Sequence, residues 1–122
     1  MPARPDLDVF FEGQPESRRL FETLLALVET VGDFELRVTK SQVAFRRRRA
    51  FAWAWMPGQY LRGKAAPLVL TVALPARDGS PRWKQVVEPA PGRFIHHLEL
   101  WSSAGMDGEV AEWLRQAWEA AG

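Results

Sequence analysis

The sequence predicts an α+β domain in which N- and C-terminal helices pack on one face of an antiparallel sheet of five or six strands. Three observations lead to this prediction. Apolar residues recur with the 3.6-residue period of a helix near both ends of the chain, from Pro15 to Gly32 and from Asp107 to Ala121. Between Phe34 and Trp101 the apolar period changes to two, which is typical of strands. Turn sequences such as "MPGQY" and "EPAPG" separate the alternating runs.

The first helix is expected to begin at Pro15, because proline suits the first helical position. Gly32 is expected to end it in the left-handed conformation. Its apolar stripe must be buried against another element and consists of Leu20, Leu24, Leu27, Val28 and Val31. Residues 1–9 are expected to form a flexible lead before it.

Six strands are expected between the helices, the fifth with the weakest alternation, at residues 34–39, 43–46, 50–55, 68–74, 83–87 and 94–101. Successive side chains of a strand point to opposite faces of the sheet. The helix-covered face is expected to carry Leu36, Val38, Leu70, Val72, Leu98 and Leu100. Alternation then places Glu35, Arg37, Thr71, His97, Glu99 and Trp101 on the opposite, polar face.

The stretch "AFRRRRAFAWAW" from Ala44 to Trp55 places four consecutive arginines between Phe45 and a run that contains Phe51, Trp53 and Trp55. A single strand of that length would be unusually long, so a hairpin is expected, with residues 47–49 in its connection. The favoured interpretation is a solvated turn, because arginines at a hairpin tip are readily hydrated. The excess of 13 arginines over 3 lysines also suggests a codon bias.

Both faces of the strand at 50–55 are apolar, which leaves two packing alternatives. Its large side chains Phe51, Trp53 and Trp55 alternate with the small Ala52 and Ala54. We favour burial of the tryptophans under the helices, because burying an indole removes about 150 to 250 Å² from water. In the alternative, the alanines allow close approach of a helix and the tryptophans lie outside.

The last helix is expected to follow an N-cap at Asp107 or Ser103. Trp113 and Trp118 lie in its apolar stripe and are expected to be part of the core.

Composition and length are those of one globular domain spanning residues 1–122. The absence of cysteine and of a readable signal peptide or membrane span favours a cytoplasmic protein that does not act in a membrane.

The net charge of +1 conceals a strong segregation along the chain. Residues 34–64 carry a formal charge of +7, whereas residues 1–33 and 97–122 carry −4 each. This pattern indicates either an anion-binding surface or acidic helices whose charges cancel those of a basic sheet.

The segments "FFEGQPESRRLFETLLALVETVG", "VTKSQVAFRRRRAFAWAWMP", "PLVLTVALP", "GRFIHHLELWS" and "VAEWLRQAWEAA" resemble the bacterial and archaeal domain-of-unknown-function family 5655. The resemblance runs from Phe10 to Ala121. It implies a small α+β domain that occurs alone or at the C-terminus of longer proteins, some of them loosely labelled as predicted transport proteins. It implies no catalytic residues.

These observations favour a non-catalytic binding or protein-interaction module. Aromatic rings beside guanidinium groups suit nucleobases and phosphates, and also suit protein interfaces, so nucleic acid, an unknown protein partner and a second copy of the chain all stay open. An enzyme is less favoured: His96 and His97 point to opposite faces, which leaves His97 and Glu99 as the one acid/base pair. No cofactor or metal is expected. The candidate binding residues are Arg37, Lys40, Arg46, Arg47, Arg48, Arg49, Trp53, Trp55 and His97.

Overall fold

We analysed a computed structural model of the chain, which describes residues 4–59 and 65–122. The described elements, in chain order, are α1 (Pro5–Phe10), α2 (Pro15–Glu29), β1 (Glu35–Val38), β2 (Val43–Arg46), β3 (Ala50–Trp55), the 3-10 turn η1 (Pro57–Gln59), β4 (Leu68–Leu74), β5 (Gln85–Ala90), β6 (Arg93–Leu100), the 3-10 turn η2 (Ser103–Gly105) and α3 (Gly108–Ala120).

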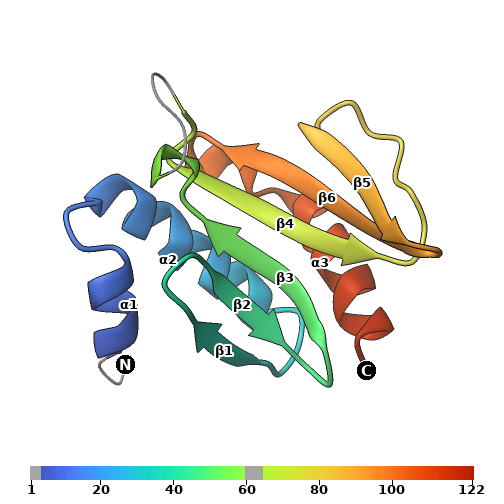
Figure 1. The fold of residues 1–122 in the computed structure, drawn as a ribbon, viewed down its shortest axis with the longest axis horizontal. Coiled ribbons are helices and arrows are strands. Elements are labelled where there is room, and N and C mark those ends of the chain that lie inside the picture. Colours follow the sequence, from blue (N-terminus) through green and yellow to red (C-terminus); the bar gives the residue numbers. More distant parts are fainter. Residues whose placement is uncertain (1–3, 60–64) are drawn as a thin grey trace.

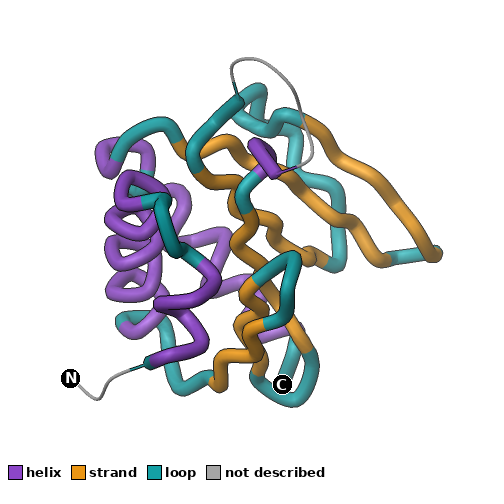
Figure 2. The backbone as a smooth tube through the Cα atoms, turned by 60° about the vertical axis from the view of Figure 1, so that its left-hand side comes forward, coloured by secondary structure: helices purple, strands orange, loops and turns teal. Residues whose placement is uncertain are grey.

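The strands form one antiparallel sheet in the order β1-β2-β3-β4-β6-β5. Helices α2 and α3 cross one face of this sheet (Figure 1), and Figure 2 shows the helices gathered on one side of the strands. The predicted α+β architecture is therefore confirmed. We call the opposite face, over which no described helix lies, the outer face. None of the described helices is long and apolar enough to cross a bilayer.

The core lies between the sheet and the helices and takes one row of side chains from each central strand. Phe21, Leu24 and Val28 of α2 and Val110 and Leu114 of α3 are fully or almost fully buried against it. Of the two N-caps that the sequence left open for α3, Asp107 is the one used, and its carboxylate accepts a hydrogen bond from the backbone N–H of Val110. Trp113 is buried, as predicted, while Trp118 is partly buried at the end of the helix.

Two expectations for the N-terminal region were wrong. Residues 1–9 were expected to be a flexible lead; residues 1–3 lie outside the described residues, but α1 begins at Pro5 and buries Leu7 almost completely. Helix α1 lies beside β1 (Figure 1). Gly32 was expected to be left-handed, but the positive-φ glycines of the described chain are Gly13 and Gly92. Gly32 is needed for space instead, because the Trp118 ring packs directly against it.

A β-bulge explains how β3 distributes its aromatic side chains. Phe45 of β2 faces Ala52, while the next residue, Arg46, faces Ala50, so Phe51 is the extra residue in β3. The bulge turns Phe51 into the core, where its ring lies 6.4 Å from that of Phe45. Ala52 and Ala54 are fully buried on the helix side.

The favoured burial of Trp53 and Trp55 under the helices is therefore wrong, and the alternative holds. Both tryptophans point away from α2 and α3 and are partly exposed on the outer face. The small alanines between them leave room for the helices to approach β3, and α3 packs on both β3 and β4.

Candidate binding surface

One row of side chains crosses the outer face from edge to edge. Residues that are paired in neighbouring antiparallel strands point to the same face. The register therefore aligns Arg37, Ala44, Trp53, Thr71, His97 and Gln85. An adjacent row contains Trp55, Val69 and Glu99. Three strands thus place two indoles, a hydroxyl and an imidazole next to one another.

These side chains line a concave part of the outer face of about 560 Å³, which lies in the volume range of small-ligand sites. We call it the outer-face hollow. It is lined by Ser41, Gln42, Trp53, Trp55, Thr71, Pro89, Arg93, Ile95 and His97. Its floor is formed by strands of the sheet, so the lining side chains are held by a rigid scaffold.

A hydrogen-bond chain fixes the orientation of three of these groups. The indole N–H of Trp55 donates to the Thr71 hydroxyl over 2.9 Å, and the same hydroxyl lies 2.8 Å from Nδ1 of His97. Burial lowers the pKa of His97, and the neighbouring His96 lowers it further. We assign His97 as the neutral tautomer in which Nδ1 accepts the Thr71 hydroxyl proton, which leaves Nε2–H as a donor.

The cations of the outer face are not neutralised by neighbouring acids. No carboxylate of a described residue lies within ion-pair distance of Arg37, Arg46 or Arg93. The acids that share this face are Glu35 and Glu99; Glu35 faces Arg46 in the register without an ion pair between them. The three arginines of the outer face therefore outnumber its two carboxylates by one, and none of these arginines is held in an ion pair within the described chain.

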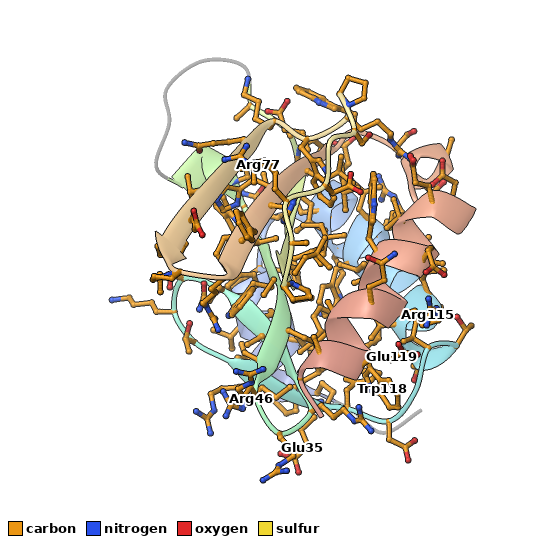
Figure 3. All side chains as sticks on the ribbon, turned by 90° about the vertical axis from the view of Figure 1, so that its right-hand side faces the viewer. Glu35, Arg46, Arg77, Arg115, Trp118 and Glu119 are labelled. Carbon is orange, nitrogen blue, oxygen red and sulfur yellow. The ribbon has the colours of Figure 1, made fainter. Side chains whose placement is uncertain are left out.

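Most acidic residues of the helices form ion pairs on their own side of the sheet. Arg18 pairs with Asp8 and Glu22, and Arg82 pairs with Asp107 and Glu109. Arg115 pairs with Glu112 and with Glu119 on α3, where Figure 3 shows Arg115 and Glu119 close together. The sequence left open whether the acidic helices cancel the charge of the basic sheet. The contacts do not support such cancellation, because the ion-paired helix acids contact Arg18, Arg82 and Arg115 and not the arginines of the outer face.

The four arginines of the β2–β3 hairpin do not act as one patch. The expected hairpin is confirmed, with residues 47–49 exposed at its tip. The Arg47 guanidinium lies 3.6 Å from the Trp118 ring centroid and donates to the Trp118 carbonyl over 3.2 Å. Arg49 donates to the carbonyl of Ala120, and the backbone N–H of Arg48 to that of Ala121. We call these contacts the C-terminal latch.

The latch explains the arginine stretch, because the final carbonyls of a helix lack intrahelical donors and carry partial negative charge. Arg47 and Arg49 therefore interact with the end of α3 and do not line the hollow formed around Trp53 and Trp55. Lys40 is also separate: it lies in the β1–β2 turn, beside Val9 and Phe10. The predicted residues that the outer face does bring together are Arg37, Arg46, Trp53, Trp55 and His97.

Sequence reasoning missed Arg93 and Ile95, which line the hollow beside His97. The alternation of β6 could have identified both residues, because residues 93, 95 and 97 share a face. His96, on the other face, is fully buried. Its Nε2 accepts from the backbone N–H of Asp78 over 3.0 Å, and its Nδ1 lies 3.2 Å from the Phe94 carbonyl. Across residues 4–59 and 65–122, no His, Asp and Glu side chains cluster in a way that would hold a metal ion.

Comparison with protein families matches residues 7–121 to the family described as "Domain of unknown function (DUF5655)". The chain belongs to the DUF5655 family. No curated protein matches this DUF5655 domain, and no solved structure matches it either. The family membership predicted from the sequence motifs is therefore confirmed.

Proposed function

We propose that this DUF5655 domain is a non-catalytic binding module whose ligand occupies the outer-face hollow. The observation that carries the proposal is the placement of Trp53 and Trp55 outside the core, on a face without a described layer over it. Partly exposed aromatic rings in a concave site provide a large contact area with few flexible bonds. We further propose a cytoplasmic location, which the absence of cysteine favours.

The same geometry does not favour catalysis. His97 is hydrogen-bonded through Thr71 to an indole N–H, which is a donor that cannot accept a proton. Acid/base sites of the hydrolytic type orient the histidine with a carboxylate instead. Burial also keeps His97 neutral, as suits a hydrogen-bonding residue of a binding surface.

The six tryptophan indole N–H signals provide a direct test by heteronuclear NMR. We would titrate the ¹⁵N-labelled protein with benzoate, 5′-adenosine monophosphate and a tryptophan-containing peptide. A ligand of the hollow should shift the Trp53 and Trp55 signals and leave those of Trp83, Trp113 and Trp118 in place. The proposal fails if no probe binds, or if binding shifts only the signals from the helix side. A dilution series identifies self-association, which would move Trp53 and Trp55 without any probe.

A further inference from the structure

We propose that the outer-face hollow binds single-stranded nucleic acid, an inference that rests on the proposed binding function. The first argument is charge. Arg37, Arg46 and Arg93 lie on the outer face without a carboxylate partner in the described chain, whereas the ion-paired arginines lie on the helix side. A polyphosphate backbone supplies the missing anions.

The positions of these cations suit a strand that runs across the sheet. Arg37 lies on β1 and Arg93 on β6, which are four strand spacings apart in the sheet order. With about 4.8 Å between neighbouring strands, β1 and β6 are about 19 Å apart across the sheet, and Arg93 also lies four residues, or about 13 Å, along β6 from His97, the residue aligned with Arg37. The two arginines are therefore separated by about 23 Å. Several nucleotides are needed to cover such a distance, and the tryptophans of β3 lie between the two ends. The arrangement therefore favours an oligonucleotide over a single nucleotide.

The aromatic rings provide the second argument. In its row, Trp53 lies between Ala44 and Thr71. The Ala44 side chain is too small to cover an indole ring. The Trp55 ring is oriented by its hydrogen bond to Thr71 and stands edge-on to His97, at a centroid distance of 6.1 Å. Sheet-borne aromatic side chains stack on unpaired bases, which present a free π-face.

The third argument is the hydrogen-bond donor that His97 retains. Because its Nδ1 accepts the Thr71 proton, its Nε2–H is the nitrogen that can donate to a ligand. Carbonyl oxygens of thymine, uracil, guanine and cytosine are matching acceptors, as are phosphate oxygens. A base that is paired and stacked within a duplex cannot contact the indole rings of the hollow and accept from Nε2–H of His97 at the same time. The site therefore favours single strands over duplexes.

Fluorescence anisotropy with labelled oligo(dT) of about 12 nucleotides tests the inference, with salt varied between about 50 and 500 mM. Three phosphate contacts predict a slope of about −2 in a plot of log K against log salt, so the affinity should fall about 100-fold over this range. Arg37→Gln and Arg93→Gln should each reduce the magnitude of the slope by about 0.7. Arg19→Gln is the matched control, since Arg19 is exposed on α2 away from the outer face, and it should bind as the wild type does.

The aromatic contribution is tested by Trp53→Ala, which should weaken binding by about 5- to 150-fold, while Trp53→Phe should retain most of the affinity. Thermal unfolding followed by circular dichroism verifies that each variant is folded. Equal affinity for a duplex or for heparin would overturn the proposal and indicate a general polyanion surface. Absence of oligo(dT) binding would also overturn it; the binding function itself would survive if the small probes still shift Trp53 and Trp55, and would fail with it if they do not.

Discussion

Substitution of Gly32 by alanine should destabilise the protein through a contact with the opposite end of the chain. A Cβ atom at Gly32 would lie 2.4 Å from Cζ2 and 2.5 Å from Cε2 of Trp118, well inside ordinary van der Waals distance. The ring has little freedom to withdraw. Its indole N–H donates to the Asp33 carbonyl over 2.8 Å, and the Arg47 guanidinium lies over its centroid at 3.6 Å.

The magnitude follows from two ways of relieving the clash. If the ring stays, overpacking costs about 1 to 3 kcal/mol. If the ring leaves, the protein loses one hydrogen bond of about 0.5 to 1.5 kcal/mol and a cation–π contact of about 0.5 to 1 kcal/mol. Alanine restricts the unfolded chain more than glycine, which offsets about 0.4 to 1 kcal/mol. The net loss is about 1 to 2 kcal/mol, or about 4 to 8 °C in Tm at this chain length.

Urea and thermal unfolding, followed by far-UV circular dichroism, measure this loss. Gly79→Ala is the matched control, because a Cβ atom there meets no atom within 4 Å. In a Trp118→Ala background the cost of Gly32→Ala should vanish, since the two positions are then uncoupled. An unchanged midpoint for Gly32→Ala in the wild-type background would refute the packing of Trp118 described above.

Three further predictions concern the latch, the histidines and the hydrogen-bond chain. Arg47→Ala should lower the free energy of unfolding by about 1 kcal/mol, whereas Arg48→Ala should leave it unchanged in urea titrations, because Arg48 serves α3 through its backbone N–H. Burial lowers the pKa of both His96 and His97, so the unfolded chain takes up protons first as the pH falls below about 6.5. Stability should therefore decrease from pH 7 towards pH 5, by at most about 1.4 kcal/mol per pH unit for each histidine; a flat profile in urea titrations over this range would contradict the buried neutral state. Thr71→Val removes the acceptor of the Trp55 indole N–H and the donor to His97. It should lower the free energy of unfolding by about 1 to 3 kcal/mol and shift the Trp55 indole signal in NMR. An unmoved signal would argue against the hydrogen-bond chain.

Local periodicity predicted most of the fold and much of the outer face. Alternation correctly placed Arg37, Thr71 and His97 on the polar side, because β1, β4 and β6 run without interruption at these residues. It failed for Trp53 and Trp55, since the bulge at Phe51 inserts one residue, so that Phe51 faces the core while the two tryptophans face the other side. No composition signal marks that insertion.

The C-terminal latch lay beyond sequence reasoning for a different reason. The hydrogen bonds of Arg47 and Arg49 to α3 join residues 71 positions apart in the chain. Four arginines at a turn are equally compatible with hydration, with phosphate and with helix carbonyls. The topology decides among these partners, because it brings the end of α3 to the β2–β3 hairpin. Helix α1 was missed because six residues are too few to establish a helical period.

The indole signals of the ¹⁵N-labelled protein, recorded during a titration with oligo(dT) at low salt, test the central claim most directly. We expect the Trp53 and Trp55 signals to move together and saturably, with Trp83, Trp113 and Trp118 unmoved. Stationary Trp53 and Trp55 signals at saturating oligonucleotide, or shifts confined to the tryptophans on the helix side, would contradict the claim that the outer face is the binding surface.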